Sequence, residues 1–315
     1  MKRILLSVLT FYLISFNTLA DEVNTLADEV KSRVNTLADK YKSRVFSNLS
    51  EKITEYTLGI IPGEGHTEFS FDLRENNSPQ YSILAVRELM KLNSGNIFTQ
   101  LSASNTEGLN TDSSGNSNER TILNLGLGTR KLFNDNTLMI GVNGFYDYDL
   151  WASHERLGLG FEAKASVFDF NVNMYQKINT SGREEHVMNG YDFQLKSQIP
   201  YVHWASVFAN GYEWKGIDRD DVKGRKLGGE AQLTPTLSFK AFYDDKDTSG
   251  LDDDWVGKII FNWPPKNNNA TAIAKLVSDE IWLQRNMEDH LLDKVERVNN
   301  IVVEFKGNMT ISRTD

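Results

Sequence analysis

The sequence predicts an all-β protein: a twelve-stranded antiparallel transmembrane β-barrel with an N-terminal periplasmic helix and a C-terminal helical segment after the last strand. Between residues 119 and 263, short runs alternate apolar and polar side chains, as at Phe168, Phe170, Val172 and Met174. A period of two is that of a β-strand with one apolar and one polar face. The connections between runs are alternately short and long, as in outer-membrane barrels, which have short periplasmic turns and longer external loops.

The composition excludes several classes of function. The 315 residues include 43 acidic and 34 basic side chains, for a net charge of −9, which argues against a nucleic-acid partner. A hydrophobic fraction of 40% argues against bulk disorder. The chain has no cysteine, which excludes disulfides and thiolate metal sites. We expect no cofactor.

The first twenty residues have the features of a secretory signal peptide. Lys2 and Arg3 precede an apolar run at residues 4–16, and small residues up to Ala20 fit a cleavage site. Ala27, in a repeat of the same residues, offers a second cleavage position. The apolar run is too short to span a bilayer as a helix, so the signal predicts a secreted, periplasmic or outer-membrane protein.

A repeat follows, and it predicts an amphipathic helix at residues 21–58. Apolar residues recur every three or four positions between Val23 and Ile53, which makes a single helical stripe. The repeat units of seven and eleven residues allow self-association as a supercoil. The alternative is a lone helix that lies against the barrel rim or the membrane. Glycine and proline end the helix between Gly59 and Gly65.

The barrel is expected at residues 66–263. An even number of strands is usual for bacterial barrels. The twelve expected strands are 67–74, 81–90, 96–104, 119–133, 137–149, 155–164, 167–178, 187–199, 203–214, 224–234, 236–244 and 254–263.

Tryptophan spacing favours a membrane barrel over a soluble β-sandwich, which also alternates apolar and polar residues. Trp204 and Trp214 are ten residues apart, and Trp255 and Trp263 are eight apart. At about 3.3 Å per residue and a strand tilt of about 40°, each pair stands roughly 20–25 Å apart vertically. That height matches a lipid-facing apolar band, so we expect these four residues to form the aromatic girdle.

Three segments carry a resemblance to a known family: GVNGFYDYDL at 141–150, HERLGLGFEAK at 154–164 and NVNMYQKI at 171–178. They resemble the translocator barrel of inverse autotransporters, the intimin and invasin family, and LLDKVERVNNIVVEF at 291–305 is similar to its linker. The resemblance implies a twelve-stranded barrel whose two ends both start in the periplasm. The linker then threads back through the pore, as a helix or an extended segment, and carries a passenger outside. The motif residues are Phe145, Tyr146, Asp147, Tyr148, Asp149, Arg156, Gly158 and Gly160.

A linker is expected at residues 264–305. After Pro264 and Pro265, apolar residues among many charges at 270–297 predict a helix. Inward-facing charges could hold this linker by salt bridges, or could line a channel. These candidate linker contacts are Arg130, Glu162, Lys164, Lys196, Glu230, Lys240 and Lys258.

Inward glycines suggest a second way in which the barrel could accommodate the linker. A glycine leaves space for another backbone. The alternative is that glycine relieves barrel curvature. The glycines in question are Gly126, Gly128, Gly141, Gly158, Gly160, Gly190, Gly211 and Gly228.

No motif supports catalysis or metal binding, and we expect no enzyme activity. Asp147 and Asp149 share a face and could pair as acid and base or hold a cation, but polar residues are expected in a lumen anyway. The aspartates at 252–254 lack the spaced ligands of a calcium loop. The five histidines show no metal-ligand spacing.

We therefore expect an anchor and export conduit in the outer membrane of a Gram-negative bacterium. It would carry a C-terminal segment, without a recognisable passenger in the short tail at 306–315. The alternative is a small plugged porin-like channel. The expected partners are outer-membrane lipid and lipopolysaccharide, periplasmic chaperones and the barrel-assembly machinery.

Overall fold

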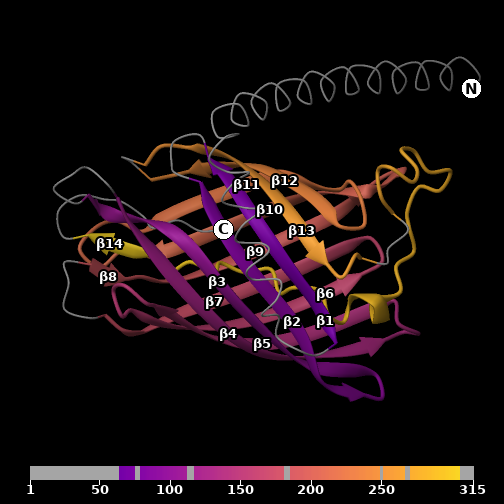
Figure 1. Cartoon of the computed structure of the whole chain (residues 1–315), viewed down its shortest axis with the longest axis horizontal. Coiled ribbons are helices and arrows are strands. Elements are labelled where there is room, and N and C mark those ends of the chain that lie inside the picture. Colours follow the sequence, from indigo (N-terminus) through magenta and orange to yellow (C-terminus); the bar gives the residue numbers. More distant parts are fainter. Residues whose placement is uncertain are drawn as a thin grey trace, which may run out of the picture. The chain divides into compact units, whose positions relative to one another are not determined.

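Twelve antiparallel strands close into a barrel (Figure 1). The computed structural model describes residues 64–74, 79–111, 117–180, 185–248, 251–266 and 270–305. The expected signal peptide, the helix at 21–58 and the tail at 306–315 lie outside these residues. Among the residues described, no helix has the length and apolar character needed to cross a bilayer.

Each strand of the wall pairs with its neighbours along the chain, and β13 pairs with β1 to close the barrel, from Thr67 opposite Trp263 to Arg74 opposite Val256. The prediction of a twelve-stranded antiparallel barrel is confirmed. The wall strands are β1 (Gly65–Arg74), β2 (Gln80–Leu92), β3 (Gly95–Thr111), β4 (Ser117–Phe133), β5 (Leu138–Asp149), β6 (Glu155–Ala165), β7 (Phe168–Asn179), β9 (Asn189–Ile199), β10 (Val202–Lys215), β11 (Val222–Gln232), β12 (Leu237–Lys246) and β13 (Asp254–Trp263).

Two short strands lie outside the wall. β8 (Glu185–Val187) belongs to the connection between β7 and β9, and it pairs with β14 (Val303–Phe305) near the C-terminal end of the described chain (Figure 1). The single strand expected at 187–199 is therefore wrong at its start. Met188 separates β8 from β9, and its amide donates to the carbonyl of Val302 instead of the wall.

Short and long connections segregate to opposite ends of the barrel. The turns after β2, β4, β6, β9 and β11 are short, and the connections after β1, β3, β5, β7, β10 and β12 are longer. In the β4–β5 turn, Asn134, Asp135 and Asn136 have φ of 51°, 52° and 64°, a conformation that asparagine and aspartate adopt more readily than other side chains. β1 begins and β13 ends at the short-turn end.

The two faces of the wall have opposite character. Apolar side chains project outward, with Leu159 69% and Met174 66% exposed. Polar side chains such as Asn171 and Asn143 are buried inside. An apolar outside around a polar inside is the arrangement of a membrane barrel. Gly211 lies on the outer face beside Phe193 and not in the lumen as expected.

The expected tryptophan girdle holds in part of the wall. Trp263 is 55% exposed, and it lies with Trp255 on the outer face of β13. The prediction for Trp214 is wrong: it is fully buried in the lumen, with its ring centroid 5.1 Å from that of Tyr175. Trp204 donates its indole N–H to the carbonyl of Leu276 at 2.9 Å.

Tyrosines complete the aromatic positions at the long-loop end. Tyr146 and Tyr191 are exposed on the outer face, 38% and 39%. Their hydroxyls donate to Glu155 and Glu213 at 2.9 and 2.7 Å. A ring in the apolar band with its hydroxyl toward a charged group suits the membrane–water boundary.

Inward glycines make room mainly for side chains of neighbouring strands. A Cβ on Gly126 would lie 2.2 Å from the ring of Phe145, and one on Gly128 would lie 2.5 Å from that of Phe98. The hypothesis that these glycines accommodate the linker is wrong, except at Gly158, where the nearest atom belongs to Arg297. At four more glycines an added Cβ would also meet a side chain of a neighbouring strand: Glu162 at Gly141, Asn143 and Asn173 at Gly160, Trp214 at Gly190, and Phe242 at Gly228.

The expected helix at 270–297 is also wrong. The described part of this segment is irregular, apart from one short 3₁₀ helix, η1 (Met287–His290), capped by the Asn286 side chain. An α-helix satisfies its own main chain and is about 10–12 Å wide with side chains. The lumen already contains large side chains, which leave little room for a helix. Its polar groups form hydrogen bonds with the main chain of a non-helical segment instead.

Candidate functional site

The chain after β13 runs along the short-turn rim and then through the lumen. We call residues 270–290 the rim segment and residues 291–302 the lumen segment. The rim segment meets successive turns of the wall. Ala272 donates its amide to Gln232 O at 2.9 Å, and the amide of Tyr201 donates to Ile281 O at 3.0 Å. Further along, Met287 donates its amide to Asn136 O at 2.8 Å, at the β4–β5 turn.

The lumen segment crosses from the short-turn end to the long-loop end. Leu291 meets β3 and β4 near their short-turn ends, and Val303 pairs with Val187 of β8 beyond the long-loop end. Extended chain between these two residues reaches about 40 Å at ~3.3 Å per residue. A helix of the same length would reach about 18 Å. The apolar band of such a barrel is about 25 Å tall, so an extended segment spans it and a helix of this length does not.

The wall holds the lumen segment by its main chain. Val295 donates its amide to Gln100 Oε1, and Val298 donates its amide to the Tyr175 hydroxyl, both at 2.8 Å. Arg156 donates to Val298 O at 2.8 Å. These bonds give buried amides and carbonyls the partners that water would otherwise supply. The other donors to main-chain carbonyls are Asn96 and Arg130 to Leu291, Arg130 to Asp293, Asn173 to Glu296, and Asn124 to Asn299.

All seven of these wall side chains come from β3, β4, β6 and β7. The opposite side of the lumen segment faces a cavity, lined in part by Phe208, Lys226, Lys240 and Lys258 of β10 to β13. The segment therefore lies against one side of the lumen.

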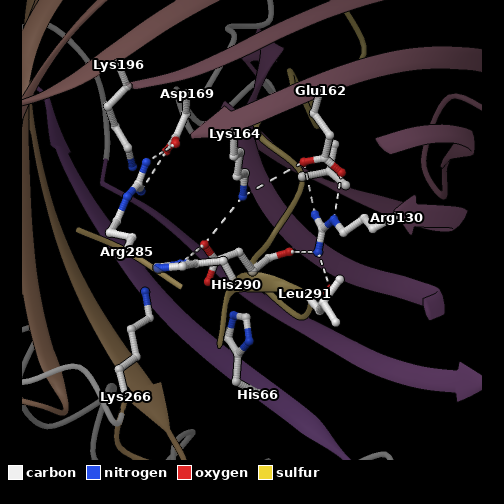
Figure 2. A network of polar contacts seen from close by, with 12 residues as sticks. His66, Arg130, Glu162, Lys164, Asp169, Lys196, Lys266, Arg285, His290 and Leu291 are labelled. Carbon is white, nitrogen blue, oxygen red and sulfur yellow. Dashed lines mark hydrogen bonds and ion pairs between the residues drawn. The ribbon is translucent and has the colours of Figure 1, made fainter. Parts of the chain in front are cut away.

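Arg130 anchors the entry to the lumen (Figure 2). Its guanidinium donates to both carboxylate oxygens of Glu162, at 2.7 and 3.1 Å, and also to the carbonyls of Leu291 and Asp293. Lys164 lies between Glu162 and the carboxylate of Asp293, 3.9 and 3.4 Å away. Arg130, Glu162 and Lys164, all expected as linker contacts, thus form one network around residues 291–293.

The other four expected contacts lie elsewhere in the lumen. Lys240 faces Glu296 of the linker at 3.7 Å. Lys196 and Glu230 pair with each other at 3.1 Å, between β9 and β11. Lys258 pairs with Asp72 of β1 at 3.1 Å.

The motif residues surround Arg297 of the linker. Arg297 donates to both oxygens of Asp147, at 3.0 and 2.7 Å. Its guanidinium lies over the ring of Phe145, 4.1 Å from the centroid. Arg156 donates to the same carboxylate at 2.8 Å. Gly158 leaves room for the guanidinium, since a Cβ there would lie 3.0 Å from Arg297 Nη2.

The charges around Arg297 balance. Asp147 also accepts from Asn124 at 2.7 Å. The Tyr175 hydroxyl, which accepts from Val298, donates to Asp192 at 2.6 Å. Two arginines and two aspartates are thus brought together in a buried site. Asp147 and Asp149 pair with separate arginines, Asp147 with Arg156 and Arg297 and Asp149 with Arg120, and not with each other.

Asp149 belongs to a second buried cluster, at the long-loop end. Arg120 pairs with Asp149 and, at 3.1 Å, with Glu185 of β8. His154 lies 3.0 Å from the same Glu185 carboxylate. This cluster fixes β8, which in turn pairs with β14 as the linker leaves the lumen. Of the remaining motif residues, Tyr146 points outward, and Tyr148 lies opposite Leu123 of β4.

Apolar side chains of the lumen segment are buried among those of the wall. Val295 packs with Phe98 and Phe145, and Val298 and Val302 pack with Tyr175 and Trp214. Ile301 packs with Ile122 and Val187.

Sequence reasoning missed Arg297 and the amide side chains. The signal for Arg297 was present, since it is the sole arginine between residues 286 and 305. The amides carried no signal, because inward asparagine and glutamine are ordinary in a polar lumen. Within the described ranges, no group of three or more histidine, aspartate or glutamate residues is placed to hold a metal ion.

Comparison with known proteins agrees with the fold. The family model for the inverse autotransporter β-domain matches residues 17–299. Inverse autotransporter adhesin YeeJ of Escherichia coli K12 is 27% identical over 214 residues, 62% of this chain and 9% of that protein. A putative attaching and effacing protein homolog of Escherichia coli K12 is 35% identical over 91 residues, 26% of this chain and 30% of that protein. The chain thus spans less than a third of the length of either relative.

A solved structure shares the barrel. It is described as "Unveiling the Mechanism Behind the in-meso Crystallization of Membrane Proteins", with a TM-score of 0.60 and 19% identity. The match covers 76% of this chain and all of that one.

Proposed function

Since this chain belongs to the inverse autotransporter β-domain family, we propose that its barrel anchors and exports the segment that follows the linker. The barrel lies in the outer membrane, and its family is one of translocator barrels and not of enzymes. The lumen segment is, in this proposal, the tether that stays in the pore after passage.

The course of the lumen segment is the observation that carries the proposal. Short turns of outer-membrane barrels face the periplasm. β1 starts and β13 ends at the short-turn end, whereas β14 lies with β8 at the long-loop end. In this proposal, whatever follows Phe305 lies on the external side.

Surface labelling of intact cells tests this orientation. An epitope after residue 315 is expected to bind antibody on intact cells and to be removed by external protease. A matched epitope in the β4–β5 turn, at Asp135, is expected to bind only after the outer membrane is permeabilised. A C-terminal epitope that binds only after permeabilisation would overturn the proposal.

A plugged channel is the second candidate, and the cavity beside the lumen segment favours it. In planar bilayers the tether is expected to leave a small conductance, and deletion of residues 270–305 is expected to raise it many-fold. A large steady conductance of the full chain would favour the channel over the tether.

The remaining partners follow from the location in the outer membrane. We propose outer-membrane lipid and lipopolysaccharide around the apolar band, and periplasmic chaperones and the barrel-assembly machinery during insertion. Residues 21–58 are proposed to self-associate. The relative YeeJ is named an adhesin, but we propose no adhesive contact for this barrel.

A further inference from the structure

The main-chain contacts in the lumen do not by themselves fix which residues stop there. An extended chain presents equivalent amides and carbonyls every two residues. If the lumen segment moved by two residues, the side chains of Gln100, Asn124 and Asn173 would meet the same kinds of groups. The wall could therefore hold many extended sequences, which suits a passage but not a stopping point.

Arg297 differs from these contacts because it is recognised by its side chain. The Arg297 side chain is 1% exposed, and its guanidinium makes two parallel bonds to Asp147. A planar, bidentate fit of this kind is specific to arginine. The Phe145 ring covers one side of the guanidinium, and Gly158 leaves space that any larger residue would fill.

A shift by two residues would empty this site of its charge. Either Val295 or Asn299 would then take the place of Arg297. Asp147 would keep Arg156 and Asn124, but it would lose its bidentate partner, and the buried site would be left with one arginine for two aspartates. Breaking a buried, hydrogen-bonded ion pair is strongly unfavourable, so such registers are disfavoured at this site.

We propose that Asp147, Arg156, Phe145 and Gly158 form a guanidinium-binding socket that recognises one arginine of an extended chain. Binding of that arginine sets the register at which the chain stops. Arg297 is the ligand of the socket in the resting state. The stopping role rests on the proposed export through the lumen, whereas the register is a property of the folded protein.

Disulfide trapping measures the register, and the natural chain has no cysteine to interfere. Ser104 Oγ lies 3.0 Å from Asn300 Oδ1, so the pair Ser104→Cys and Asn300→Cys reports the resting register. The pairs Ser104→Cys with Val298→Cys, and Ser104→Cys with Val302→Cys, report shifts by two residues. Each pair is oxidised in purified, folded barrel, and the cross-linked fraction is read from gel mobility.

With Arg297 present, only the 104–300 pair is expected to cross-link above background. With Arg297→Ala, that fraction is expected to fall several-fold, and a shifted pair is expected to cross-link. Lys294→Ala is the matched control: it removes a linker cation that pairs with Glu68 at 2.9 Å and is expected to leave the pattern unchanged.

An unchanged single register in Arg297→Ala would overturn the inference, as would an equal shift in Lys294→Ala. If Arg297→Ala does not fold, as judged by gel mobility without boiling, Arg297→Lys decides the same comparison, because it keeps the charge and loses the bidentate fit. Surface labelling is read separately. A C-terminal epitope that reaches the surface while Arg297→Ala keeps one register rejects the socket and leaves the export proposal standing.

Discussion

The rim segment and the lumen segment are consecutive stretches of one chain with opposite environments. Four apolar side chains of the rim segment are exposed, Ile273 at 73%, Leu276 at 66%, Val277 at 64% and Ile281 at 49%, whereas Met287 near its end is buried. Ile301 and Val302 in the lumen are fully buried. The rim segment is attached to the turns by main-chain bonds and by a few side chains such as Arg285, which pairs with Asp169. The lumen segment is enclosed by charges, amides and rings. We therefore expect similar mixtures of apolar and charged residues to contribute very differently to stability in the two segments.

The largest expected effect of a single change in the lumen is that of Asp147→Ala. It leaves Arg156 and Arg297 buried without their shared carboxylate, which costs about 3–5 kcal/mol of unfolding free energy. Urea unfolding in detergent micelles measures the loss. Asp279→Ala in the rim segment is the control, because Asp279 is 94% exposed, and it should change stability by about 0.5 kcal/mol or less. Equal losses for the two variants would contradict the comparison.

A matched isoleucine pair tests packing in the two segments. Ile301→Ala removes a fully buried side chain and is expected to cost about 2–5 kcal/mol. Ile273→Ala makes the same change at a 73% exposed position and is expected to stay within about 0.5 kcal/mol. The same urea titration compares them. A stability loss in Ile273→Ala as large as that in Ile301→Ala would show that the rim segment is also packed.

A single main-chain contact is expected to contribute less. Gln100→Ala leaves the buried amide of Val295 without its acceptor, at a cost of about 1–3 kcal/mol. Limited proteolysis should then cut the lumen segment faster, while the wall stays intact. Thr99→Ala on the same strand is the control, because the Thr99 hydroxyl bonds to Gly126 O of the wall and not to the linker. Equal cleavage rates in the two variants would argue against main-chain anchoring.

The smallest expected effect is at the Lys275–Asp279 pair of the rim segment. Both side chains are exposed, 55% and 94%, so solvent screens their attraction. Lys275→Ala should change the unfolding free energy by about 0.5 kcal/mol or less, with or without added salt. A clear loss that disappears in high salt would contradict this expectation and show that the exposed pair itself stabilises the rim segment.

Most of the barrel could be predicted because its signal is local. The alternation along β6 and β9 requires one face in lipid, and short turns such as the one at Asn134 follow from residue type. The same reasoning failed at Trp214, because a tryptophan ten residues from another satisfies a girdle spacing equally well from inside the lumen. β8 and β14 could not be predicted, because three-residue strands carry no period.

The candidate site was predicted in its charges but not in its geometry. Arg130, Lys164 and Lys240 were expected to meet the linker only because they occupy alternate, inward-facing positions of their strands, and they do contact it. An inward-facing position does not distinguish them from Lys196 and Lys258, which pair with side chains of the wall. The partner of an inward charge depends on which strands face each other across the lumen, and the sequence pattern of one strand does not contain that information.

The sequence by itself determined the strands, the outer face and the closed antiparallel wall, because a period of two and the turn residues act over a few positions. The tertiary structure alone decided that residues 270–302 are irregular and not an α-helix, and that Arg297 meets Asp147. The spacing of apolar residues there suits a helix. Once the segment is enclosed, the polar side chains of β3 to β7 supply its main-chain hydrogen bonds, and the distance across the lumen requires an extended chain.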